Sequence, residues 1–284
     1  MDEATIRSRI RRLLEGAGVA GPPVDLHALR EHLGNVDVEY AHMGELLGSV
    51  ERKAGRFRIR LNLSESRRQR FTLAHEIAHT LLMRAVVRPT VVQLRVREPA
   101  RHDEQEALCD AIAAEILMPY HLFRPRVLRL PVSIEAIRRL ADEFDTSVQA
   151  TAIRYAHLTE QEMATIIWRH SQHSLVARVT PSQPGVHLGG QWAARPVDEL
   201  RNGPAHALHC NHIVVTWETK CRARKADQLY CESLGLLSGK DRFVLSLVKT
   251  GVTPEAFDFR QHQAHRSCTM AARRDPSQGG TQWS

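Results

Sequence analysis

The chain has 284 residues, of which 43% are hydrophobic, enough to bury a core in one large domain or two smaller ones. Its formal net charge of +7 is spread along the sequence and favours a solvated basic surface over a dedicated nucleic-acid interface. The 5 cysteines include no Cys-x-x-Cys pair, no apolar leader begins the chain, and no run approaches the ~20 apolar residues of a membrane span. We therefore expect a cytoplasmic protein with free thiols and no membrane segment.

Two helices and three strands are predicted in the first 62 residues, over 4–16, 25–34, 36–41, 46–51 and 56–62. Asp25 is the expected N-cap of the second helix. In the last strand, apolar residues at 57, 59 and 61 alternate with arginines at 56, 58 and 60, so one face is buried and the other is an arginine stripe. The stripe is typical of a solvated face or a charged sheet edge, and the alternative is a surface for an acidic partner.

The helix predicted over residues 65–84 carries His75-Glu76-x-x-His79. The two histidines lie one turn apart on the same face, where two imidazoles can bind one zinc ion. Glu76 is then placed to take a proton from a water on that ion. The competing interpretation is a pair of hydrogen-bonded core histidines.

Residues 85–102 are expected to form a loop, followed by a helix over 104–117. A catalytic zinc needs a third protein ligand, and Glu106 and Asp110 share one face of this helix, whereas Glu115 points the opposite way. Glu106 is the predicted ligand, and Asp110 is expected to hydrogen-bond one histidine. The alternatives are a capping box with Asp103 for Glu106 and a salt bridge with a loop arginine for Asp110.

Helices over 134–144 and 147–158 follow, with Ser147 as a cap, and their spacing resembles a helix-turn-helix only weakly. Beyond residue 160 the clearest strands are 165–169, 175–179, 212–218 and 243–248, which indicates a small second α+β unit. A second metal cluster at His206, His209, Cys210 and His212 has unsuitable spacing. The predicted organisation is a metallopeptidase domain over 1–160, a C-terminal domain over 161–259 and a disordered tail over 260–284.

Two segments resemble the ImmA/IrrE family of zinc metallopeptidases: Arg70-Phe71-Thr72-Leu73-Ala74-His75-Glu76-Ile77-Ala78-His79, and residues 106–119, Glu-Ala-Leu-Cys-Asp-Ala-Ile-Ala-Ala-Glu-Ile-Leu-Met-Pro. Residues 22–26 and the helices up to Leu158 also match. Cys109 and Ile112 stand where the family more often has Ala and Phe, a difference expected to affect packing and not chemistry.

The resemblance implies an α+β fold with a mainly helical, zincin-like domain. It also implies zinc ligands His75, His79 and Glu106, with Glu76 as the acid/base. The family's studied members cleave a helix-turn-helix repressor and so induce stress or mobile-element genes, which makes such a repressor the expected protein substrate. Some members carry a sensor-like domain in the position of this chain's second half.

Two other hypotheses remain open from the sequence: a non-proteolytic regulator that binds a repressor or DNA, and a structural metal or core-histidine site. Direct DNA binding is not expected. We predict substrate pairing along the strand 56–62. Four side chains are candidates for stabilising the oxyanion: His102, Tyr120, His121 and Tyr155.

Overall fold

A computed structural model describes residues 2–63, 66–84, 91–95, 104–171, 174–182, 194–196, 207, 214–220, 228–238 and 241–249. The chain divides into two compact units, Met1–Pro131 with Glu135–Thr159, and Val132–Ile134 with Glu160–Ser284. Within the described ranges, none of the helices has the length and apolar character needed to cross a membrane. Two sheets and seven described helices confirm the predicted α+β class.

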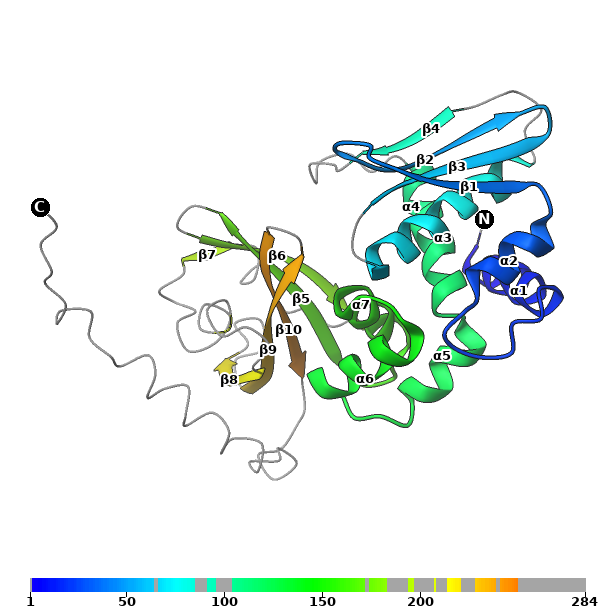
Figure 1. The fold of residues 1–284 in the computed structure, drawn as a ribbon. Helices are drawn as coiled ribbons and strands as arrows, with labels where there is room; N and C mark the ends of the chain where they lie inside the picture. The colour runs from blue at the N-terminus through cyan, green and yellow to red at the C-terminus, as the bar shows by residue number, and fades with distance from the viewer. Residues whose placement is uncertain are drawn as a thin grey trace, which may run out of the picture. The chain divides into compact units, whose positions relative to one another are not determined.

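Eleven elements precede residue 160 (Figure 1). In chain order they are α1 Glu3–Gly16, α2 Leu26–Leu33, β1 Val36–Ala41, β2 Leu46–Lys53, β3 Arg56–Asn62, α3 Ser66–Met83, β4 Val91–Arg95, α4 Glu104–Leu117, α5 Tyr120–Val127, α6 Ile134–Phe144 and α7 Val148–Leu158.

Helix boundaries follow local capping chemistry. The carboxylate of Asp25 accepts hydrogen bonds from the backbone N–H groups of His27 at 2.8 Å and Ala28 at 3.1 Å, which begins α2. Gly34 ends the same helix with a positive φ of 74°. The hydroxyl of Ser147 accepts from the backbone N–H of Ala150 at 3.1 Å and begins α7. The caps predicted at Asp25 and Ser147 are confirmed.

The first sheet has the order β1-β3-β2-β4. β2 and β3 form an antiparallel hairpin whose turn residues, Ala54 and Gly55, have positive φ values of 47° and 79°. β1 adds parallel to the other side of β3. β3 is therefore an interior strand, and the prediction that residues 56–62 form a free edge for the substrate is wrong.

The arginine stripe of β3 is an exposed face matched by acidic residues of β1. Arg56 forms an ion pair with Asp37 at 2.7 Å, and Glu39 lies 3.4 Å from Arg58 and 3.6 Å from Arg60. These cross-strand ion pairs balance the charge of the arginine stripe with carboxylates of the same sheet.

The other face of the sheet is buried on α3, which in turn packs against α4 (Figure 1). Phe57, Ile59 and Leu61 of β3 are at most 1% exposed, as the alternating pattern predicts. Ile77 of α3 and Ile116 of α4 are fully buried in the same core. This packing holds the motif helix rigidly between the sheet and α4.

In the first unit, two elements differ from the sequence prediction. β4 lies inside the stretch 85–102 that was expected to be a loop, and it pairs antiparallel with β2. Its Val-Val-Gln-Leu segment favours a strand, but the prolines at 89 and 99 argue for a loop, and only the partner strand decides. α5 was also missed, because Pro119 precedes it and Pro125 lies inside it.

The second unit contains a six-stranded antiparallel sheet of order β7-β6-β5-β10-β9-β8. Its strands are β5 Met163–Ser171, β6 Ser174–Pro181, β7 Ala194–Pro196, β8 Val214–Lys220, β9 Gln228–Ser238 and β10 Asp241–Lys249. β7 and β9 were not predicted. Trp168 is fully buried and its indole N–H donates to the hydroxyl of Ser246 at 2.9 Å. The four histidine and cysteine residues whose spacing does not suit a second metal site, at 206, 209, 210 and 212, lie outside the described residues, as does the predicted tail, 260–284.

Candidate metal centre on two packed helices

His75 and His79 lie one turn apart on α3, and the Nε2 atoms of their rings point toward one another. Their Nε2 atoms are 3.1 Å apart, and the side chains are 1% and 0% exposed. A separation of 3.1 Å permits a hydrogen bond between the two rings, and it is also short enough for both nitrogens to bind one metal ion.

The carboxylate of Glu106 on α4 lies against the same two nitrogens. One of its oxygens is 3.3 Å from His75 Nε2 and the other is 3.6 Å from His79 Nε2. The structure thus brings together the three side chains predicted as ligands. The capping alternative cannot be followed because Asp103 lies outside the described residues, but the Glu106 carboxylate faces the histidines.

The other ring nitrogens have partners of their own on α4. His75 Nδ1 lies 2.9 Å from an oxygen of Asp110, the contact expected from the sequence. His79 Nδ1 lies 3.3 Å from the sulfur of Cys109, a contact that the sequence analysis missed. Cys109 follows Glu106 by three residues on the same helix face, so the helical period could have revealed it.

Glu76 is fully buried beside this cluster, and neither carboxylate oxygen has a hydrogen-bond partner among the described residues. Burial, and secondarily the charge of Glu106, raises the pKa of Glu76 to about 8. A buried carboxylate without a hydrogen-bond partner destabilises the folded state, because the hydrogen bonds it made to water are not replaced. A water or cation next to it would supply the missing partner, so the residues present fit a metal-dependent hydrolytic site.

Strand β2 crosses α3 directly over Glu76. A Cβ atom at Gly48 would lie 2.8 Å from a Glu76 oxygen and 2.6 Å from the methyl group of Thr72. Any larger residue at this position would therefore collide with the carboxylate or its helix. Gly48 was not recognised in the sequence, because its role depends on a contact between distant segments.

Burial favours the neutral forms of His79 and Cys109. Burial, and then the charge of His75, lowers the pKa of His79 to about 4, so its imidazole keeps a lone pair at neutral pH. Burial, and then the neighbouring carboxylates of Glu106, Asp110 and Glu76, raises the pKa of Cys109 to about 12. Its sulfur is a thiol and not a thiolate.

Two donor sets can be drawn around the histidine pair. Ligand atoms of His75, His79 and Cys109 also lie within 4.8 Å of one another. Cys109 faces the Nδ1 atom of His79, however, while Glu106 faces the Nε2 atoms of both rings. We favour the set with Glu106, since only the Nε2 atoms of the two rings converge on one point.

The N-terminal half of α3 is anchored by arginines. Arg70 donates to the carbonyl oxygen of Val24 at 2.9 Å and forms an ion pair with Asp145 at 3.0 Å. Arg67 forms an ion pair with Asp142 at 2.7 Å. These contacts fix the direction in which α3 presents the histidines.

Two of the four oxyanion candidates, Tyr155 and Tyr120, have contacts with neighbouring residues of the fold. The hydroxyl of Tyr155 donates to the carbonyl oxygen of Leu130 at 3.0 Å, and its ring is fully buried. The ring of Tyr120 lies under the guanidinium of Arg7 at 4.0 Å. His121 is half-buried, and His102 lies outside the described residues.

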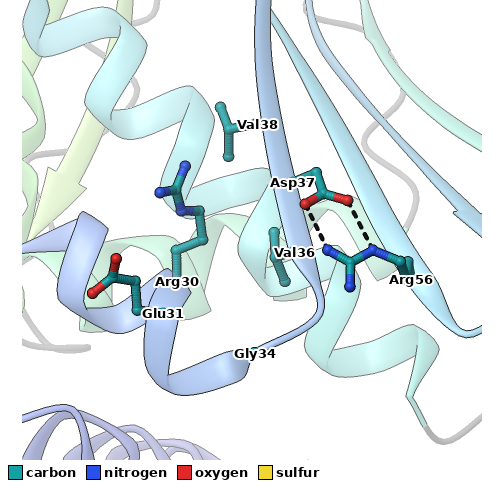
Figure 2. Close-up of a pocket in the computed structure, with 7 residues that line it drawn as sticks. All are labelled: Arg30, Glu31, Gly34, Val36, Asp37, Val38 and Arg56. Atoms are coloured by element: carbon teal, nitrogen blue, oxygen red, sulfur yellow. Dashed lines mark hydrogen bonds and ion pairs between the residues drawn. The ribbon is translucent and has the colours of Figure 1, made fainter.

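A hollow on the surface of the first unit lies between α2 and β1, and Figure 2 shows the Asp37–Arg56 ion pair across it. It contains none of the candidate metal ligands. Its lining residues are Arg30, Glu31, Gly34, Val36, Asp37, Val38 and Arg56.

Comparison with known proteins finds similarity over the part of the chain that contains the candidate metal ligands. Residues 35–155 match the family model described as the IrrE N-terminal-like domain, a peptidase family. The radiation response metalloprotease IrrE of Deinococcus deserti is 30% identical over 165 residues, 58% of this chain and 57% of that protein. The protein of the same name from Deinococcus radiodurans is 29% identical over 165 residues, 58% of this chain and 49% of that protein.

The chain thus spans about half the length of the curated relatives it matches. A solved Mycobacterium tuberculosis transcriptional regulator has a TM-score of 0.57 at 12% identity, over 99% of this chain and 94% of that chain. A likeness at so low an identity concerns the fold alone. Residues 35–155 thus resemble the IrrE N-terminal-like domain, and the curated relatives with which the chain shares 165 aligned residues are named metalloproteases.

Proposed function

We propose that this protein is a zinc-dependent endopeptidase. The observation that carries the proposal is the buried carboxylate of Glu76, which has no hydrogen-bond partner among the described residues and lies beside the converging Nε2 atoms of His75 and His79. A site built only for stability would pair that carboxylate, because its burial is otherwise unfavourable.

His75, His79 and Glu106 would hold the cation, a donor set that suits zinc and leaves one position open. A zinc ion there would supply Lewis acidity, lowering the pKa of water and polarising a peptide carbonyl. Glu76 acts as general base on the attacking water and then delivers the proton to the leaving amine.

The substrate would pair along β4 in place of β3. Three observations support this placement: β4 is an edge of the sheet, it pairs with β2, and Gly48 of β2 contacts Glu76. An extended peptide added to that edge gains main-chain hydrogen bonds. It would then lie one strand away from β2, the strand that covers the base.

Within this proposal the substrate is a helix-turn-helix repressor in the cytoplasm, and its cleavage induces stress-response or mobile-element genes. The support is the family resemblance, together with relatives named radiation response metalloproteases. The alternative is a regulator that binds a repressor or DNA without cutting. A regulator that only binds its partner would not need the buried general base Glu76.

The test is to incubate the zinc-loaded protein with the helix-turn-helix repressor encoded beside its gene and to identify fragments by mass spectrometry. Wild type should cut at one site, and Glu76→Gln should bind zinc but not cut. Glu106→Gln should lose zinc, whereas Glu104→Gln, an exposed residue at the start of the same helix, should keep both zinc and cleavage. Cleavage by Glu76→Gln, or a wild type without stoichiometric zinc, contradicts the proposal.

A further inference from the structure

One face of α4 carries Glu106, Cys109 and Asp110, residues related by the i, i+3 and i+4 spacing of a helix. Each meets a different atom of the histidine pair on α3. Glu106 lies against the two Nε2 atoms, Asp110 against His75 Nδ1 and Cys109 against His79 Nδ1. Every ring nitrogen of the pair therefore faces a side chain from a single stretch of helix.

The Nδ1 contacts decide which nitrogen of each ring carries the proton. A carboxylate can only accept, so Asp110 fixes the proton of His75 on Nδ1 and leaves Nε2 with its lone pair. A second ring in the same tautomer needs an acceptor at its own Nδ1. The sulfur of Cys109, at 3.3 Å, is the atom in that position.

We propose that Cys109 is a positioning residue: its sulfur accepts the Nδ1–H of His79 and so holds the Nε2 lone pair toward the cation. This inference rests on the proposed metal site. His79 and Cys109 are both fully buried. Without the sulfur, the N–H of His79 would be buried without that acceptor, and the ring would no longer be fixed in rotation or in tautomer.

The opposing possibility is that Cys109 itself binds the ion. The geometry disfavours it, because the two nitrogens of an imidazole point in different directions and the one facing sulfur is not the one facing Glu106. The two roles have different spectroscopic signatures. A coordinating thiolate gives a charge-transfer band with Co²⁺, and a hydrogen-bonded thiol gives none.

The experiment measures the affinity of the full chain for Zn²⁺ by competition with a chromogenic chelator, and the absorption spectrum with Co²⁺. Cys109→Val fills the volume without an acceptor and should weaken Zn²⁺ binding about tenfold, the lower end of the range for a second partner of a ligand. Cys109→Ser restores an acceptor and should recover most of that loss. If the valine variant does not fold, Cys109→Ala is compared with serine instead.

Cys231 provides the matched control, since it is a fully buried thiol of the second unit. Cys231→Ala should leave Zn²⁺ affinity unchanged, although it also removes a buried sulfur. Equal affinity in wild type and in both acceptor-free Cys109 variants overturns the inference, and so does a thiolate-to-cobalt band that disappears in Cys109→Ser. These outcomes leave the proposed peptidase intact, whereas a wild type that binds no metal sinks both proposals.

Discussion

Two buried glutamates of the first unit, Glu76 and Glu115, show how differently the same side chain can be used. Glu115 of α4 is 3% exposed, forms an ion pair with Arg154 and accepts the backbone N–H of Tyr120 at 2.8 Å. Glu76 of α3 is fully buried with both oxygens unpartnered among the described residues.

The carboxylate of Glu115 stabilises the fold through its partners, whereas the unpartnered carboxylate of Glu76 destabilises it. Arg154 also donates to the carbonyl oxygen of Met118, so the group around Glu115 closes the C-terminal end of α4. Strain and unpaired polar atoms, by contrast, concentrate where a protein acts on another molecule. The comparison predicts opposite responses to the same substitution.

Glu115→Ala should give the largest change in stability. Removing the carboxylate leaves the buried guanidinium of Arg154 without its ion pair and with only the carbonyl oxygen of Met118 as a partner, which costs about 3–5 kcal/mol. Chemical denaturation of the metal-free protein measures the loss of unfolding free energy. Glu104→Ala, at an exposed position of the same helix, should change it very little. A denaturation midpoint equal to that of wild type in Glu115→Ala would show that Glu115 does not stabilise the fold, and would contradict its contrast with Glu76.

Glu76→Gln should act on turnover and not on stability. Loss of a general base should slow cleavage by at least about 100-fold, while the unfolding free energy stays equal or rises because a buried ionisable group has been removed. The measurement pairs peptide cleavage with the same denaturation curve. A variant as destabilised as Glu115→Ala would show that Glu76 is a structural residue after all.

Gly48→Ala tests the strand above the base. The added methyl group meets Glu76 and Thr72 at less than 3 Å, so either the strand or the carboxylate must shift. Overpacking of this kind costs about 1–3 kcal/mol, and cleavage should fall with it. Zinc affinity should be kept, since the ligand atoms are not those displaced. Wild-type cleavage together with wild-type stability would exclude a tight contact here.

Much of this site follows from helical periodicity. The one-turn separation of His75 and His79, and the shared face of Glu106 and Asp110, are local properties of α3 and α4. Cys109 obeys the same rule but was read only as a packing residue. Strand order, by contrast, depends on contacts between distant segments, which is why β3 was mistaken for an edge, β4 was missed, and Gly48 had no visible role.

The smallest predicted effect is a pH dependence of the metal-free protein. Glu76 has a pKa of about 8 in the folded protein, against 4.5 in the unfolded chain. The folded chain therefore binds more protons between these values, and stability falls as pH rises through about 8. His79 contributes oppositely, with stability present above 6.5 and lost as pH falls through about 4. Between pH 6.5 and 8 His79 is already neutral while Glu76 titrates, and the contribution of Glu76 should lower the unfolding free energy by up to about 2 kcal/mol. Denaturation in the presence of a chelator measures this decline, which Glu76→Gln should abolish and which Glu104→Gln should retain.

A wild-type curve that is flat across this window would mean that Glu76 is already ionised without metal, and the distinction between the two buried glutamates would then rest on their hydrogen bonds alone.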